Sequence, residues 1–163
     1  MIVYIPLSRK YIALVSECDE TRLRAHKWHA SGYGRRIYAI RRVRDPETGK
    51  SQTIRMHREI MHASPGYMVD HINHDTLDNR RENLRLCTNT ENACNRRKTR
   101  GTSQYKGVYR SCIYSCWEAS IQVNGRSIYL GRFTDERDAA RAYNVAALKY
   151  HGTFACLNDI EEP

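Results

Sequence analysis

The chain has 163 residues, with 27 Lys or Arg against 18 Asp or Glu, so its formal net charge is +9. At 40% hydrophobic and 28% charged residues, it has the composition of one folded domain or two small ones, and is neither disordered nor membrane-embedded. No window approaches roughly 18 consecutive apolar residues, and Arg9 and Lys10 interrupt the N-terminal apolar stretch too early for a signal peptide. We therefore expect a cytoplasmic protein whose six cysteines stay thiols.

Residues 1–66 predict a β-rich extension. Apolar runs favour strands at 2–7, 11–15, 38–43 and 53–56, a helical stretch is expected at 17–28, and the Asp-Pro-Glu-Thr-Gly cluster predicts a turn. Trp28 is expected to be a core anchor. A set of arginines is expected to line DNA phosphates, although a solvated strand face explains them almost as well: Arg35, Arg36, Arg41, Arg42 and Arg44.

Residues 67–92 are an acidic island in a basic chain, with 5 acidic and 3 basic side chains. Val69 and Ile72 bracket a short strand, residues 73–83 read as a polar loop, and 84–87 alternate like a second strand. Thr88 and Glu91 form a Ser/Thr-x-x-Glu capping box, which predicts the start of a helix. The island is therefore expected to fold as two strands followed by a helix.

Four side chains of this island have the chemistry of a hydrolytic metal site. Asp70 offers a charged oxygen and Asn92 a carbonyl oxygen, which are hard ligands for Mg²⁺ or Mn²⁺ if the helix packs against the hairpin. His71 can take a proton from water at neutral pH. Asn83 is expected to accept a hydrogen bond from the other ring nitrogen and to orient the imidazole. Each residue alone is commonly turn chemistry, whereas the whole set is far more specific.

Residues 56–95 resemble the HNH nuclease motif of phage homing endonucleases. The matching residues are Met56 to Met61 as the lead-in, Asp70 and His71, Asn83, and Asn92. The resemblance implies a ββα-metal fold, with His71 as general base, Asp70 and Asn92 as metal ligands and Asn83 as the residue that holds His71. Asn92 stands where many relatives have His, which favours Mg²⁺ or Mn²⁺ over zinc. His74 is expected at a turn and His57 in a structural role.

The basic run that follows predicts a linker. Residues 95–104 are polar and end in small residues, so the domain boundary is expected near Gly101, between a nuclease domain at 1–100 and a second domain at 101–163. Three cations of this run, Arg96, Arg97 and Lys98, are expected to contact DNA.

The C-terminal segment predicts a hairpin and a helix. Asn124 and Gly125 call for a two-residue turn, and counting outward pairs Gln122 with Ser127, Ser120 with Tyr129 and Glu118 with Gly131. Apolar and polar residues then fall on opposite faces of the sheet. Thr134 is expected to cap a helix that runs to Gly152, and its small-residue face would lie on the apolar side. The helix face consists of Ala139, Ala140, Tyr143, Ala147 and Tyr150.

This segment resembles the plant ethylene-response-factor DNA-binding domain of the APETALA-two type, through runs such as Tyr105 to Arg110, Tyr129 to Phe133 and Asp138 to Tyr143. The resemblance implies a three-stranded antiparallel sheet packed on one helix, and places DNA contacts on eight residues: Lys106, Gly107, Tyr109, Gln122, Ser127, Tyr129, Arg132 and Tyr143. Tyr109, Gln122 and Ser127 stand where the plant domain usually has Arg, and Tyr129 stands where it has Trp. We therefore expect the docking mode to carry over but not the recognised bases. Arg110 and Arg126 of the same segment are also expected to contact DNA.

The sequence thus predicts an α+β chain, a ββα-metal nuclease domain followed by a duplex-binding sheet module. The predicted function is that of a homing-type DNA endonuclease dependent on a divalent cation, Mg²⁺ or Mn²⁺, which nicks one strand or cleaves both. We expect double-stranded DNA as partner, no membrane, no small-molecule cofactor, a monomer or weak dimer, and the host-cell cytoplasm if the chain is phage-encoded. The alternatives are a non-catalytic transcriptional regulator with a decayed nuclease, an RNA-binding protein and, least favoured, a zinc site at Cys112 and Cys116.

Overall fold

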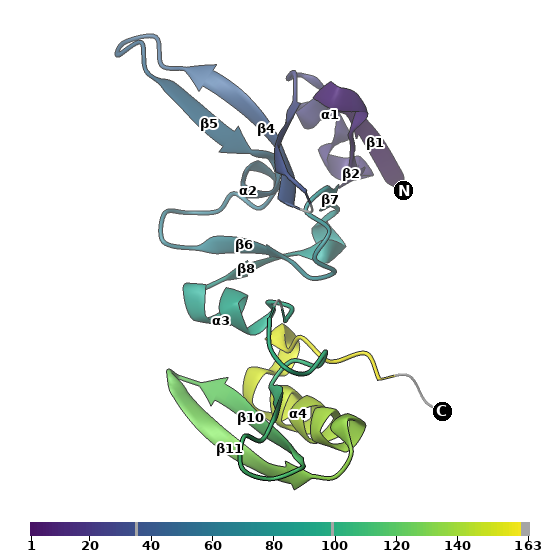
Figure 1. Ribbon diagram of the computed structural model, residues 1–163. Coiled ribbons are helices and arrows are strands. Elements are labelled where there is room, and N and C mark those ends of the chain that lie inside the picture. The colour runs from purple at the N-terminus through teal and green to yellow at the C-terminus, as the bar shows by residue number, and fades with distance from the viewer. Residues whose placement is uncertain (35, 99, 161–163) are drawn as a thin grey trace. The chain divides into compact units, whose positions relative to one another are not determined.

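The computed structural model describes residues 1–34, 36–98 and 100–160, and Arg35, one of the arginines expected to line phosphates, lies outside them. The chain is a mixed α+β protein of small sheets and short helices, as predicted (Figure 1). It forms two compact units, Met1–Asn89 and Thr90–Pro163. The units meet before the boundary expected near Gly101, and where the folding domains divide stays a prediction. Within the described residues, no helix is long and apolar enough to cross a membrane.

The N-terminal extension is part of the first unit. Strand β1 (Ile2–Pro6) pairs antiparallel with β2 (Ile12–Ser16), and a short helix η1 (Ser8–Lys10) lies between them. Strand β2 also pairs in parallel with β7 (Asp78–Asn79), which belongs to the loop predicted at 73–83. The extension and the loop therefore share one three-stranded sheet, in the order β1-β2-β7.

A second sheet of this unit contains β3 (His29–Tyr33), β4 (Arg36–Arg44) and β5 (Ser51–Arg55), joined in that order. The helix expected at 17–28 is much shorter, with a 3₁₀ turn η2 (Glu17–Asp19) followed by α1 (Glu20–Arg24). The chain leaves the helix because Trp28 is buried in the core, where its indole N–H donates to the Leu23 carbonyl at 2.9 Å. Strand β3 was not predicted, because its residues lack an apolar alternation.

One hydrophobic core joins these two sheets of the first unit. It is built from strands of the extension, from α1 and Trp28, from α2 (Met56–Ile60) and from Leu84 of β8 (Leu84–Cys87). Its members include Ile5, Ala13, Val15, Leu23, Trp28, Ala39, Met56 and Ile60. The extension therefore completes the core beneath the predicted nuclease motif.

The motif begins with an antiparallel pair, β6 (Met68–His71) with β8, as the sequence predicted. A 3₁₀ turn, η3 (Arg81–Asn83), leads into β8. The helix α3 (Asn89–Cys94) starts directly after Thr88, where the capping box placed it. His74 has φ 67°, the left-handed conformation of a tight turn, in agreement with its expected position.

The second unit contains the predicted sheet and helix. Strands β9 (Val108–Arg110), β10 (Trp117–Val123) and β11 (Arg126–Phe133) form an antiparallel sheet in the order β11-β10-β9. Helix α4 (Glu136–His151) packs against it, followed by η4 (Gly152–Phe154). The helix cap is Asp135, whose side chain accepts the Arg137 backbone N–H at 2.6 Å, so the prediction of Thr134 was wrong by one residue.

The hairpin register is partly as predicted. Gln122 pairs with Ser127 and Ser120 with Tyr129, but a bulge follows, and Glu118 then pairs with Arg132 instead of Gly131. A bulge places one extra residue on one strand and exchanges the faces of the residues beyond it. Arg132 consequently lies on the face away from α4, while Phe133 packs into the core.

Gly107 lies where β9 meets α4. Its φ is +75°, and a Cβ there would be 2.0 Å from the Tyr143 ring and 2.6 Å from the Ser120 carbonyl oxygen. Tyr143 is only 2% exposed, so its ring has no room to retreat. Gly107 is therefore required by packing as well as by backbone conformation.

We predict that Gly107→Ala destabilises the second unit by about 3 kcal/mol, the sum of a left-handed backbone penalty and overpacking. The matched control is Gly125→Ala, at φ +79° with no atom within 4 Å of a built Cβ. It should cost only about 1 kcal/mol. Urea denaturation of both variants measures the difference, and equal losses would contradict this role of Gly107.

His57 is a buried histidine of α2, 4% exposed, as its expected structural role requires. Its ring contacts the rings of His71 and Tyr38, with centroids 5.0 and 5.5 Å away. The pKa of His57 is lowered from its ordinary value of 6.5 to about 3, mainly by burial, and positive charge on the neighbouring His71, Arg55 and Arg58 side chains acts in the same direction. The ring is therefore neutral in the folded protein.

This burial predicts a loss of stability in acid. Below pH 6.5 the unfolded chain binds a proton at His57 that the folded chain does not bind, so stability falls as the pH drops from about 6.5 toward 3. This effect of His57 alone should lower the free energy of unfolding by about 2 kcal/mol between pH 7 and pH 5. The variant His57→Gln should lose that part of the slope in denaturation curves at the two pH values, and an unchanged slope would contradict the prediction.

Candidate functional site

Asp70 and His71 are consecutive residues of β6, and both are buried. Asp70 lies directly opposite Arg85 of β8. Its Oδ2 accepts two hydrogen bonds from Arg85, from Nε at 2.9 Å and from Nη2 at 2.6 Å. The carboxylate predicted to hold an ion therefore has a cationic partner, which the sequence analysis did not identify.

The His71 imidazole is fixed by Asn79 of β7. Its Nε2 lies 3.3 Å from the Asn79 side-chain oxygen, and the Asn79 amide nitrogen donates to the Leu77 carbonyl at 3.1 Å. The amide is thereby oriented with its oxygen toward the ring. Since that oxygen can only accept, Nε2 carries the proton and Nδ1 carries the basic lone pair.

Burial lowers the pKa of His71 below its ordinary value of 6.5, while the hydrogen bond to Asn79 and the charge of Asp70 act in the opposite direction. The rings of His57 and Tyr38 lie against it, with centroids 5.0 and 6.3 Å away. His71 is therefore neutral near pH 7, as a general base must be.

Asn83 holds the loop and not the imidazole, which corrects the predicted contact. Its side-chain oxygen accepts the Asn73 backbone N–H at 3.0 Å, and its amide nitrogen donates to the Asp78 carbonyl at 2.7 Å. Its own carbonyl accepts the Ile72 N–H at 2.9 Å. Asn83 thus joins both ends of the loop that follows His71, and its catalytic role stays a prediction.

Asp78 is a second buried side chain that holds this loop closed, after Asn83. Its carboxylate accepts hydrogen bonds from the Asn73 amide at 2.9 Å and from two nitrogens of Arg80 at 2.8 Å each. Hydrogen bonding from Arg80 is the main reason that the pKa of Asp78 is below its ordinary value. The carboxylate therefore stays charged and keeps the loop closed at neutral pH.

The loop is also bound to the N-terminal extension. Leu14 of β2 donates its N–H to the Leu77 carbonyl at 2.9 Å, and the Thr76 hydroxyl donates to the Ile37 carbonyl at 2.6 Å. Arg81 donates its side-chain N–H groups to the buried Asp19 at 2.7 and 2.8 Å. The extension thus fixes the segment that carries Asn79.

The donor chemistry at Asp70 suits a hard divalent cation. Within residues 1–34, 36–98 and 100–160, no three His, Cys, Asp or Glu side chains gather as metal ligands. A carboxylate oxygen completed by water and phosphate is the usual arrangement for Mg²⁺. Asn92 lies on α3, in the second compact unit, and its part in holding an ion with Asp70 stays a prediction.

The predicted DNA contacts of the second unit fall into separate groups. Five of these residues lie on the sheet face away from α4. Side chains alternate between the two faces of a strand, and the pairing places these five on the same face as Glu118 and Ser120. On this face Arg132 is ion-paired with Glu118 at 3.1 Å, and its guanidinium lies 4.0 Å from the centre of the Tyr114 ring. The five are Tyr109, Gln122, Ser127, Tyr129 and Arg132.

Four of the residues predicted to contact DNA instead contact other residues of the second unit, which argues against direct DNA contact. Lys106 donates its ammonium to the Cys94 carbonyl, and Lys98 donates to the Tyr105 and Val108 carbonyls at 2.8 Å each. Burial lowers the pKa of both lysines. Tyr143 is buried beneath the sheet and Gly107 lies against its ring. These residues hold the fold together.

The remaining predicted cations are exposed. Arg110 pairs with Trp117 and Arg126 pairs with Val123, which places both arginines on the sheet face that packs against α4. The Arg110 guanidinium lies 5.5 Å from the centre of the Trp117 ring. Arg96 and Arg97 are exposed after α3.

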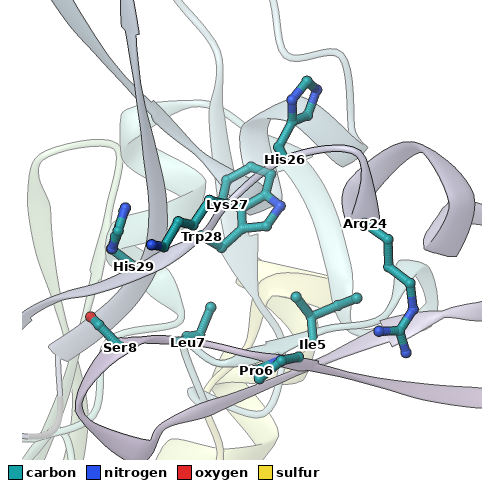
Figure 2. Close-up of a pocket in the computed structure, with 9 residues that line it drawn as sticks. All are labelled: Ile5, Pro6, Leu7, Ser8, Arg24, His26, Lys27, Trp28 and His29. Carbon is teal, nitrogen blue, oxygen red and sulfur yellow. The ribbon is translucent and has the colours of Figure 1, made fainter.

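The first unit has a hollow of about 540 Å³ between β1 and the segment that follows α1. Figure 2 shows the residues that line it. Ile5, Leu7 and Trp28 line it together with cations such as Arg24 and Lys27. It contains none of the predicted site residues. The hollow is therefore separate from the candidate active site.

Two site residues, Asn79 and Arg85, were missed by the sequence analysis. The loop contains several asparagines, and their order along the chain does not show which one reaches the ring. Arg85 had a usable signal, because Leu84, Arg85 and Leu86 alternate on a strand whose partner is the strand of Asp70.

Comparison with known proteins finds HNH endonuclease similarity in one part of the chain. A family model described as HNH endonuclease matches residues 63–94. An uncharacterized HNH endonuclease, L560, of Acanthamoeba polyphaga mimivirus is 36% identical over 93 residues, which are 57% of this chain and 48% of that protein. This chain thus spans about half the length of the viral relative.

The other region is similar to plant AP2-like ethylene-responsive transcription factors. CRL5 of Oryza sativa subsp. japonica is 44% identical and ANT of Arabidopsis thaliana 45% identical, each over 62 residues. These alignments cover 37% of this chain but only 10% and 11% of the plant proteins. Residues 63–94, which include Asp70, His71, Asn83 and Asn92, are therefore similar to HNH endonucleases, and the other region is similar to AP2-like proteins.

Proposed function

We propose that the chain is a metal-dependent DNA endonuclease of the homing type, which hydrolyses a phosphodiester bond of duplex DNA and nicks one strand in each event. The observation that carries this proposal is the buried, neutral His71, whose Nε2 is bound to Asn79 and whose neighbour is Asp70. Similarity to HNH endonucleases over residues 63–94 supports the same conclusion.

In the proposed reaction, His71 accepts a proton at Nδ1 from the water that attacks phosphorus. The hydrogen bond of Nε2 to Asn79 keeps the ring in place as it becomes charged, and Asp70 stabilises that charge at close range. The bond from phosphorus to the 3′ oxygen breaks and that oxygen takes up a proton from solvent, which leaves 5′-phosphate and 3′-hydroxyl ends. The enclosing rings of His57 and Tyr38 limit the access of bulk water to the base.

A divalent cation, Mg²⁺ or Mn²⁺, would be held by Asp70 with Asn92 as its predicted second ligand, and when bound it supplies charge stabilisation for the phosphate and the departing oxygen. Oxygen donors favour these hard ions over zinc. The zinc alternative at Cys112 and Cys116 lacks further ligands among the described residues.

We propose that the second unit binds the duplex through the open face of its sheet, with the exposed Arg96 and Arg97 on phosphates. The plant relatives are named as transcription factors, which favours one second candidate, a regulator that binds DNA without cutting it. The two candidates differ in whether bound DNA is broken.

A supercoiled-plasmid assay tests the function. We predict that wild type forms nicked circles with Mg²⁺ or Mn²⁺ and none with EDTA, whereas His71→Ala and Asp70→Ala lose at least about 100-fold in rate, because a general base alone contributes about 10²–10⁴-fold. Both variants should still retard DNA in a gel shift. If wild type retards DNA but leaves it intact with every ion, the binding-only regulator is correct.

Asn79 gives a second test. We predict that Asn79→Ala lowers kcat by about 10- to 100-fold with little change in KM, since it removes the acceptor that orients the base, a part of the general-base contribution. Asn79→Asp keeps an acceptor and should retain more of the rate. Gln52→Ala, which removes an exposed amide of β5 in the same unit, should have no effect. Wild-type rates in both Asn79 variants would contradict its orienting role.

A further inference from the structure

Arg85 and Asp70 form an ion pair at the heart of the candidate site. Two guanidinium nitrogens of Arg85 donate to one oxygen, Oδ2, of Asp70 at 2.9 and 2.6 Å. Asp70 is 7% exposed and the Arg85 side chain 15%. The carboxylate that is proposed to hold a divalent cation is therefore already neutralised by a side chain of the same hairpin.

This pairing weakens the attraction for a cation. An unpaired carboxylate would meet the ion with a charge of −1, whereas the pair has a net charge of zero, and the guanidinium itself repels the ion. The screening by water is weak here, because both groups are largely buried.

A DNA phosphate can relieve this weakened attraction for the cation. Guanidinium presents its N–H donors as a planar fork, and phosphate is among the anions that such a fork binds best, so a phosphate can compete with Asp70 for Arg85. A phosphate beside Arg85 supplies the negative charge that the pair lacks. It would also supply an oxygen to an ion at Asp70.

We propose that Arg85 is a positioning residue that couples metal loading to DNA binding. Without DNA it holds the Asp70 carboxylate and keeps its affinity for Mg²⁺ or Mn²⁺ low, and a phosphate of the bound strand takes up its guanidinium and raises that affinity. The inference rests on the proposed function, since the ion and the strand are those of the nuclease reaction.

The test measures Mn²⁺ binding, by electron paramagnetic resonance of the free ion, in the full chain carrying His71→Ala so that DNA stays uncut. A short duplex should tighten Mn²⁺ binding of this parent by at least about tenfold. Adding Arg85→Met should tighten binding without DNA by about tenfold, as expected for removal of a like charge at short range. In the Arg85→Met variant, the additional tightening of Mn²⁺ binding that DNA causes should be smaller than in the parent.

Three controls separate charge from other effects. Arg85→Lys keeps the charge and should bind Mn²⁺ without DNA within about threefold of the parent. Lys50→Met removes the same charge at an exposed position of the same unit and should change nothing. Asp70→Asn should abolish the binding in every background, which assigns the measured ion to Asp70.

Thermal unfolding provides an independent readout. Arg85→Met leaves a buried carboxylate without its counterion, so its midpoint without Mn²⁺ should fall, and Mn²⁺ should raise that midpoint by more than it raises the parent's. Equal or weaker Mn²⁺ affinity in Arg85→Met, with an equal or smaller Mn²⁺-induced rise, overturns the inference even if wild type nicks DNA. If wild type neither nicks DNA nor binds Mn²⁺ in its presence, the proposed function fails as well.

Discussion

A histidine buried in a folded domain is usable as a base only if its neighbours fix one tautomer and leave it neutral. Asn79 provides that constraint in this chain, and Asn79 is held by its own environment. Its amide donates to the Leu77 carbonyl, and its strand β7 pairs with β2 of the N-terminal extension. The geometry of His71 therefore depends on residues far away in the sequence.

The loop after His71 shows why so many polar residues can be buried there. Asn73, Asp78 and Asn83 satisfy one another and the backbone groups at both ends of the loop. A buried polar group costs free energy only when it lacks a partner, so a closed network of this kind stabilises one conformation. The charge of Asp78 is balanced by Arg80 in the same way that Asp70 is balanced by Arg85.

Much of the fold followed from local patterns, and the differences arise where distant contacts decide. Strand 84–87, the helix after Thr88 and the inner pairs of the Asn124–Gly125 hairpin were predicted correctly because alternation, a capping box and turn chemistry act over a few residues. The helix expected at 17–28 is short because Trp28 belongs to a core shared with β-strands and α2. No local pattern contains that information.

The same limit applies to the candidate site. The types of its residues were readable, because an Asp-His pair followed by spaced asparagines is chemically specific. Their contacts were not, since Asn79 and Asn83 differ only in where the closed loop places them. Lys106 and Tyr143 show the converse, because resemblance to a DNA-binding domain assigned them to an interface although their side chains are engaged within the unit.

The bulge in the second unit has a consequence for how its sheet meets DNA. Without it, Arg132 would pair with Trp117 on the face that α4 covers, and the open face would carry Glu118 as its single charged residue among those of β10 and β11. With the bulge, Arg132 lies on the open face and neutralises Glu118. The hydroxyl and amide groups of Tyr109, Gln122 and Tyr129 lie on the same face as this ion pair. A balanced face of this kind attracts phosphates weakly, but its hydroxyl and amide groups can form hydrogen bonds with base edges. In a duplex-binding unit of this composition, sequence-independent affinity would come from exposed cations such as Arg96 and Arg97, and discrimination between sequences from the sheet.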